Sequence, residues 1–359
     1  MGLEELSEIE KRKPSIANKS GLDAVISGME ECVSRVKTMM ILPFPLYSIQ
    51  KVYEIAEKRL ESADYSEDEI IDCIIAGRKY EDYGNKAIAG AYTGALLSIL
   101  TERNSKKGRK TIMYVDEKCS GFDYLFYNAR SFDEVYLNNF NGDYACYGME
   151  NGRRAVVNNS HGDTMFWDIA SGKIEKRDNA HPNAEMILIN NYQPNVYFNT
   201  EIGSFAGAYG GSIGLFLANS CCSWQTGRDI AYSEGFADTV ILNKTKGDEI
   251  GNGIACNRGR VNNLLIIGGS QNFVGNDIAQ VGGSVGNLLV QGKKGKVMCG
   301  ANFYRVERQI SRSRNKRRFM EKRGIPKILA LAEQMKTAGK DEIIMLSEQI
   351  WQEYTENRK

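Results

Sequence analysis

Short apolar runs recur along the middle of the chain, and each is followed by a polar stretch rich in Asn, Gly and Asp. In the copy at 239–253, Val240 and Leu242 stand two positions apart and precede Asn243 and a Gly-Asp pair. A period of two puts both apolar side chains on one face of a strand. We call the second of the two apolar residues the anchor of each copy. The anchors are Leu137, Val157, Ile189, Leu217, Leu242, Ile267 and Val290.

The repeat has the length of one coil of a parallel β-helix. Successive anchors are separated by 20, 32, 28, 25, 25 and 23 residues, which is too short for propeller blades. The second half of each copy is Gly-rich and strand-like, whereas a leucine-rich repeat needs apolar residues at helical spacing there. We therefore predict a mainly β protein, a parallel β-helix of about seven or eight coils with helical segments at both ends. The anchors are predicted to point inward together with the apolar residues two positions before them, Val135, Ala155, Ile187, Leu215, Val240, Leu265 and Leu288.

Asparagines lie just past most of the anchors. Because a side-chain amide both donates and accepts hydrogen bonds, equivalent asparagines of stacked coils can satisfy one another. We therefore expect a ladder of amides along the solenoid. Its members would be Asn138, Asn139, Asn158, Asn159, Asn190, Asn191, Asn219 and Asn243.

The first 84 residues are predicted to form a helical domain. Apolar residues follow a helical spacing over 22–39 and 48–60, and Ser66 with Glu69 three positions later is the pattern of a capping box. Such a domain would cover the first coil, because an open terminal coil is an unpaired sheet edge.

The β-helix is predicted to occupy 85–304. The Gly/Ala-rich run at 87–100 fits either a buried helix or an early coil. The remaining residues, 305–359, form a basic C-terminal helical segment in which 327–337 and 341–354 have the spacing of amphipathic helices.

The two ends of the chain carry charge of opposite sign. Residues 305–323 contain nine cations against Glu307 and Glu321, a net charge of +7, whereas 1–82 carry 11 positive and 17 negative groups, a net charge of −6. The overall charge of +1 conceals this asymmetry. Attraction between the ends of neighbouring molecules predicts a homo-oligomer or another protein partner.

The composition limits where the protein can act and which metal sites it can form. The N-terminus is charged, the mean hydropathy is −0.39 and the run at 87–100 is too short to span a bilayer, so we expect a cytoplasmic protein without a membrane partner. Eight cysteines and two histidines occur without a C-x-x-C pair. We therefore expect no metal site and no cofactor, and we interpret the cysteines as reduced, mostly buried thiols.

Three features could support catalysis, and each has a plainer structural interpretation that we favour. His161 lies next to a Gly-Asp pair, which suits acid–base chemistry but also an exposed turn. Asp143, Asp163 and Asp248 share one phase of the repeat, like the carboxylate row of β-helical polysaccharide-cleaving enzymes, yet Gly-Asp is ordinary turn chemistry. The Cys221–Trp224 cluster departs from the turn pattern, which is also what a packing variant would do.

The basic segment is the candidate nucleic-acid site. Seven of its nine cations are arginines, which suit bidentate phosphate contacts. On a continuous helix Arg308, Arg312 and Lys316 would share one face with Arg305. The alternative is a solvated helix whose arginines pair with the acidic N-terminal domain. The candidate residues are Arg305, Arg308, Arg312, Arg314, Lys316, Arg317, Arg318, Lys322 and Arg323.

Two short motifs resemble those of the scaffold proteins of SUF-type iron–sulfur cluster assembly. They are Ser270-Gln271-Asn272 within a coil and Arg323-Gly324-Ile325-Pro326 after the coils. The resemblance implies a β-helix between helical segments, and it carries over no cluster ligands, since no His follows His181. The Gly spacing of the coils is similar to that of the β-helical domain of glutamate synthase.

These observations favour a non-catalytic solenoid scaffold whose long side binds proteins. Nucleic-acid binding through 305–323 is the first alternative. A β-helical enzyme, or a scaffold for iron–sulfur assembly, is the second.

Overall fold

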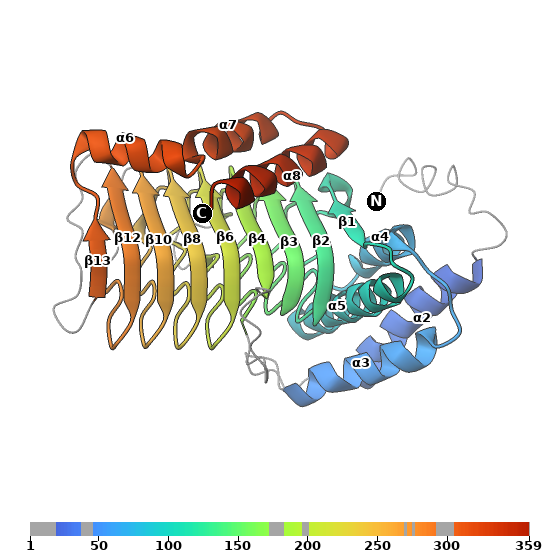
Figure 1. The fold of residues 1–359 in the computed structure, drawn as a ribbon. Coiled ribbons are helices and arrows are strands. Elements are labelled where there is room, and N and C mark those ends of the chain that lie inside the picture. The colour runs from blue at the N-terminus through green and yellow to red at the C-terminus, as the bar shows by residue number, and fades with distance from the viewer. Residues whose placement is uncertain are drawn as a thin grey trace.

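The chain folds as a parallel β-solenoid of about seven turns with helices at both ends (Figure 1). The computed structural model describes residues 19–36, 46–171, 183–195, 201–268, 271–274, 277–291 and 305–358. Its main sheet has nine parallel strands in the order β1-β2-β3-β4-β6-β8-β10-β12-β13. They are β1 (Ile112–Val115), β2 (Ser131–Asn138), β3 (Asn151–Asn158), β4 (Ala184–Asn190), β6 (Ser212–Asn219), β8 (Phe236–Asn243), β10 (Arg260–Ile267), β12 (Ser284–Gln291) and β13 (Arg305–Gln309).

A smaller sheet forms a second side of the solenoid. Its four short strands pair in parallel in the order β11-β9-β7-β5. They are β5 (Glu201–Ile202), β7 (Gln225–Thr226), β9 (Gly247–Ile250) and β11 (Gln271–Val274). The core therefore lies inside the coils, enclosed by the two sheets and by the turns that connect them.

Five of the seven predicted anchors point into this core. The inner row of the main sheet runs Leu137, Val157, Ile189, Ala218, Leu242, Ile266 and Val290 in register. The predicted inward position of Val240 is also confirmed, since its side chain is completely buried in the inner core.

The predicted register is wrong by one residue in two strands. Leu217 pairs with Leu188 and Ile241, and its side chain faces outward, as does that of Leu215. Ile267 likewise stands one position too late, because Ile266 occupies the inner row. Both strands are apolar at consecutive positions, so a period of two does not reveal which face is the inner one.

The predicted asparagine ladder is confirmed for seven of its eight members, while Asn139 is exposed and belongs to neither row. Asn158 Nδ2 donates to Asn138 Oδ1 (2.8 Å), Asn190 to Asn158 (2.7 Å), Asn219 to Asn190 (2.8 Å) and Asn243 to Asn219 (2.6 Å). A second row of amides contains one hydrogen bond, from Asn191 Nδ2 to Asn159 Oδ1 (2.7 Å). The five side chains of the first row, from Asn138 to Asn243, are at most 7% exposed, so the ladder removes five polar amides from water while keeping them hydrogen-bonded.

The N-terminal helices cover the first coil. They are α2 (Lys19–Arg35), α3 (Leu46–Leu60), α4 (Glu67–Gly77) and α5 (Tyr83–Lys106). The capping box of Ser66 and Glu69 is present at the start of α4. The run at 87–100 is part of the buried helix α5, and its small residues permit close contact, since a Cβ on Gly90 would lie 2.2 Å from the carbonyl oxygen of Tyr124.

The C-terminal helices lie along the outer face of the main sheet and do not cap its end (Figure 1). They are α6 (Ser313–Lys322), α7 (Ile325–Met335) and α8 (Lys340–Glu356). The inner faces of α7 and α8 contribute Ile328, Met335 and Ile350 to a second apolar cluster with Leu188 and Leu217 of the sheet. This cover explains why the strands are apolar on both faces.

Polar contacts fix α7 and α8 on the sheet. The ladder amides of Asn158 and Asn190 donate to the carbonyl oxygens of Met335 and Ala332 (2.9 Å each), in the last turn of α7. Carbonyls in the last turn of a helix lack the usual amide partner, so the ladder contributes to the C-terminal cap, together with the Ala338 N–H that donates to Met335 (3.3 Å). On α8, Glu348 forms an ion pair with the buried Arg154 (2.5 Å).

Candidate nucleic-acid interface

The basic segment is a strand followed by a helix. Val306 of β13 packs against the inner core, and Ile310 is 3% exposed in the outer cluster. Helix α6 then begins at Ser313, and Gly324 ends the segment in the left-handed conformation (φ 64°). The expected single helical face of Arg305, Arg308, Arg312 and Lys316 is therefore wrong, because β13 pairs with β12 before the helix starts.

Helix α6 has two faces of different chemistry. Phe319 and Met320 are half-buried against the outer cluster, and Lys316 lies between them and the sheet, where its Nζ donates to the carbonyl oxygen of Val290 (2.6 Å). The opposite face is exposed. It carries Arg314, Arg317, Arg318, Glu321 and Lys322, and no residue of α6 is fully buried.

Most of the exposed cations have no counter-ion among the residues that the structure describes. Arg317 is the exception, with an ion pair to Glu321 (2.7 Å). Arg323 is half-buried and donates to the carbonyl oxygen of Arg358 (2.8 Å). Arg308, Arg312, Arg314, Arg318 and Lys322 make no ion pair or side-chain hydrogen bond within the described ranges. The Arg305 side chain lies outside the described part.

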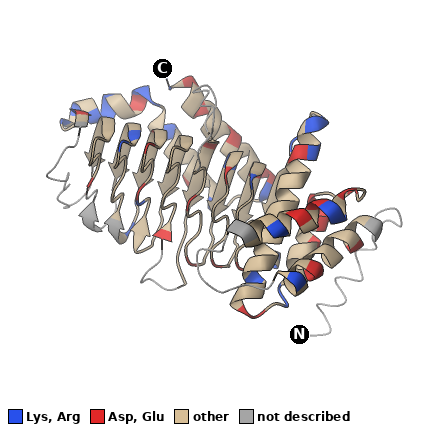
Figure 2. Cartoon of the chain, turned by 90° about the horizontal axis from the view of Figure 1, so that it is seen from below, with Lys and Arg blue, Asp and Glu red and all other residues tan. Residues whose placement is uncertain are grey.

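Arginines of α6 do not pair with the N-terminal helices of the same chain. Figures 1 and 2 show α6 at the far end of the solenoid from α2–α5. For the described helices α2–α5, the alternative in which the arginines pair with the N-terminal domain of the same molecule is therefore wrong. Pairing between the ends of two neighbouring molecules stays a prediction.

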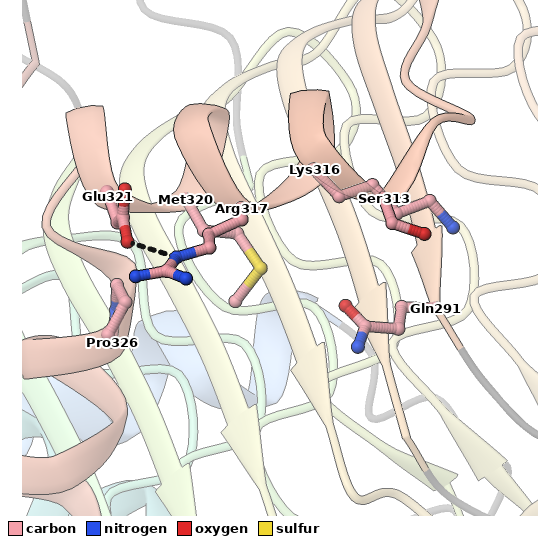
Figure 3. A pocket seen from close by; sticks show the side chains of 7 residues that line it. All are labelled: Gln291, Ser313, Lys316, Arg317, Met320, Glu321 and Pro326. Carbon is pink, nitrogen blue, oxygen red and sulfur yellow. Dashed lines mark hydrogen bonds and ion pairs between the residues drawn. The ribbon is translucent and has the colours of Figure 1, made fainter.

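A pocket of about 420 Å³ lies between α6, the end of β12 and the start of α7 (Figure 3). Gln291 and Ser313 line one side, while Met320 supplies an apolar wall. The Arg317–Glu321 pair also lines this pocket (Figure 3), so Arg317 is partly neutralised there. The pocket therefore adds little free positive charge to the surface.

Sequence reasoning missed two further cations near this end of the solenoid. Arg260, at the start of β10, and Arg358, beyond α8, line a second pocket together with Arg323. They are far from the basic segment in sequence, and only the docking of α8 on the sheet brings Arg358 to β8, where its Nε lies 3.5 Å from Asp238. No local motif marks them.

The described residues among the features considered for catalysis lie at turns and corners of the coils. His161 is exposed at a coil corner. The backbone N–H of Asp143 donates to Asp123 Oδ1 in the preceding coil (3.0 Å), and the backbone N–H of Asp163 donates to Asp143 Oδ1 (2.8 Å). The carboxylates of Asp123 and Asp143 thus accept hydrogen bonds from backbone amides. Burial raises the pKa of Asp143. The Asp248 side chain and His181 lie outside the described residues.

Burial raises the pKa of each described cysteine thiol. The seven that the structure describes form no disulfide. Burial raises the pKa of Cys221 to about 12, and its Sγ donates to the carbonyl oxygen of Ile189 (3.4 Å). Within the described ranges, no three His, Cys, Asp or Glu side chains are grouped to hold a metal ion. The Arg323–Pro326 motif is the break between α6 and α7, with Gly324 left-handed.

Comparison with known proteins adds no information on activity: no protein-family model, curated protein or solved structure matches the chain. In the described part of the chain, no helix is both long and apolar enough to cross a bilayer.

Proposed function

We propose that this protein binds nucleic acid through the phosphate backbone, with α6 and the residues flanking it as the contact surface. The observation that carries the proposal is the set of five exposed cations, Arg308, Arg312, Arg314, Arg318 and Lys322, that have no counter-ion among the described residues. Unpaired guanidinium groups on a helix are suited to charge-assisted contacts with phosphate.

The mode of binding follows from the shape of α6. Ten residues make a helix about 15 Å long, which matches about four phosphates of one strand. Arg314, Arg318 and Lys322 recur every four residues along the exposed face. The only aromatic residue of the helix, Phe319, is half-buried toward the sheet, so α6 itself presents no exposed ring for base stacking. We expect binding with little sequence preference.

The solenoid holds α6 in place. Helix α6 is attached to the sheet by the hydrogen bond from Lys316 to Val290 and by the packing of Phe319 and Met320 on the outer cluster.

The described cysteines form no disulfide, which supports our proposal that the protein works in the cytoplasm.

The test compares two triple variants of equal charge. Arg312→Ala/Arg314→Ala/Arg318→Ala removes three exposed cations from the proposed surface. Lys106→Ala/Lys107→Ala/Lys118→Ala removes three exposed cations near α5, at the other end. Binding of RNA and DNA oligonucleotides is measured by fluorescence anisotropy between 50 and 200 mM salt.

We expect the wild-type affinity to fall about tenfold or more over this range. The α6 variant should bind more weakly, and its plot of log affinity against log salt should flatten by about 2 for single strands, since each lost phosphate contact removes about 0.7. The control variant should keep the wild-type slope. No binding by the wild type at 50 mM salt, or equal losses in both variants, contradicts the proposal.

A second function, that of a protein scaffold, is supported by a stripe of aromatic rings on one corner of the solenoid. Tyr147 stacks on Trp167 (4.6 Å between centroids), which is followed by Phe205 (5.0 Å), and Tyr209 at the end is 45% exposed. Aromatic residues are enriched in protein interfaces. Helices α7 and α8 pack on the outer face of the main sheet, so a partner that binds a long side of the solenoid would use another side.

The scaffold function is tested with Tyr209→Asn, because Tyr209 has φ 50° and Asn tolerates this conformation. A protein partner that binds the wild type at fixed stoichiometry should lose affinity for this variant and keep it for the α6 triple variant. A partner that binds all three chains equally does not use the stripe.

A further inference from the structure

A second pocket opens on the outer face of the main sheet, beyond the region that α8 covers. Its volume is about 310 Å³, at the lower end of the range of ligand sites. The floor is formed by β10 and β12, with Asn262, Asn263 and Asn287. Arg260 and Arg358 line it together with Arg323, the last cation of the basic segment.

The pocket exists because one outward position of the sheet lacks a side chain. Gly286 of β12 follows Asp238 and Asn262 at this position of β8 and β10. At Gly214, the equivalent residue of β6, the Trp351 ring fills the space, so that an added Cβ would lie 3.1 Å from it. At Gly286 the nearest atoms are backbone atoms of Asn262, and the space above the sheet stays open.

The donors around this space exceed the acceptors. Asp238 already accepts from Tyr354 (2.6 Å) and Asn262 (2.7 Å) and lies 3.5 Å from Arg358. Arg260 uses only its Nε, which donates to Asn262 Oδ1 (3.2 Å). Three guanidinium groups therefore face two carboxylates, Asp238 and Glu307, and one of these is already hydrogen-bonded.

We propose that this pocket binds a phosphate monoester, and that its ligand is the terminal phosphate of a nucleic-acid strand lying on α6. The strand-end assignment rests on the proposed function. A terminal phosphate carries a charge of about −1.5 to −2 at pH 7, compared with −1 for an internal diester, and it presents three oxygens to donors. Arginine forks suit such a group. Arg323 connects the pocket to α6, as it follows the last residue of the helix.

The pocket is tested first without nucleic acid. Inorganic phosphate is titrated into the full-length protein by isothermal calorimetry at low salt, with Arg260→Ala/Arg358→Ala as the variant. Arg258→Ala is the control. The Arg258 side chain lies just before β10, is 75% exposed and forms an ion pair with Glu234. Phosphate should bind the wild type and the control at one site, and the double variant should bind it at least about tenfold more weakly.

Oligonucleotides that differ only in a 5′-phosphate, a 3′-phosphate or hydroxyl ends then test the assignment. One phosphorylated end should improve wild-type affinity about tenfold. The double variant should lose this preference and bind hydroxyl-ended strands within about twofold of the wild type. The α6 triple variant should bind strands more weakly but should bind inorganic phosphate like the wild type.

The outcomes separate the two proposals. Phosphate binding with no strand binding overturns the nucleic-acid function and the strand-end assignment together. Strand binding that is indifferent to terminal phosphate, or phosphate binding that the double variant retains, overturns the pocket proposal alone. Thermal melting of each variant verifies folding, and a double variant that does not fold is replaced by Arg260→Ala, whose guanidinium makes only one hydrogen bond.

Discussion

Replacement of Asn190 by alanine should release the C-terminal helices from the solenoid. Asn190 is completely buried at the centre of the amide ladder. Its Nδ2 donates to Asn158 Oδ1 (2.7 Å) and to the carbonyl oxygen of Ala332 (2.9 Å), and its Oδ1 accepts from Asn219 (2.8 Å). The side chain thus joins two neighbouring coils and α7.

The magnitude follows from the groups left without a partner. Asn190→Ala leaves two acceptors and one donor in a region closed to water, and each unsatisfied buried group costs about 1–3 kcal/mol. Asn219 keeps a contact with Glu333 (3.3 Å), which reduces the loss on that side. We expect a decrease of about 3–5 kcal/mol in the free energy of unfolding, which is large against the 5–15 kcal/mol typical of domains.

Urea denaturation followed by circular dichroism and by tryptophan fluorescence measures this loss. Trp351 of α8 packs on Gly214, while Trp167 and Trp224 lie in the coils, so fluorescence reports the docked α8 together with the coils and circular dichroism reports the whole fold. Asn315→Ala is the control, because Asn315 is exposed on α6 and should change stability by less than about 0.5 kcal/mol. A loss below about 1 kcal/mol for Asn190→Ala would show that the ladder does not hold α7.

Three further predictions concern the core, pH and assembly. Val240→Asp places a charge inside the coils at a completely buried position, which costs several kcal/mol and should unfold the protein; unchanged melting of this variant would refute the inner register. Burial raises the pKa of Asp168 from 3.8 to about 6, so the contribution of this carboxyl to stability should fall as pH rises from about 4 to about 6. Asp168→Asn removes the ionisation and should be more stable than the wild type by up to about 3 kcal/mol at pH 7, with no difference at pH 3; an equal pH profile in thermal melts is the contrary result. The opposite charges of the two ends predict a molecular mass that falls as salt is raised in light scattering, and a constant monomer mass from low to high salt refutes self-association.

The sequence was sufficient where one physical constraint acted alone. The repeat length and the period of two required a parallel solenoid. The five anchors that were assigned correctly to the inner row are each followed directly by Asn or Gln, which marks the end of the strand, although their other neighbour on the strand is apolar too. The ladder followed from the position of Asn158 and Asn190, since amides at equal phases of stacked strands must meet. The capping box at Ser66 needed only local chemistry.

The candidate site was only partly accessible in this way. Composition locates the basic segment, because charge density is a local property of the chain. It does not show that Lys316 turns toward the sheet while Arg314 and Arg318 face solvent, since that depends on which side of α6 meets the outer cluster. Nor does it bring Arg358 to Arg260 and Arg323 around one pocket, because 98 residues separate Arg260 from Arg358 along the chain.

What the sequence by itself determined is the solenoid, its coil phase and the charge of its two ends, because each depends on short-range periodicity or composition. Only the tertiary structure decided that the side chains of Leu215 and Leu217 point outward. Both faces of β6 are buried, one by the inner core and the other by α7 and α8. The same docking turned the amide ladder into a helix cap and left α6 exposed. A helix that buries its apolar side against a distant sheet cannot be placed from local spacing, because many sheet positions offer the same apolar surface.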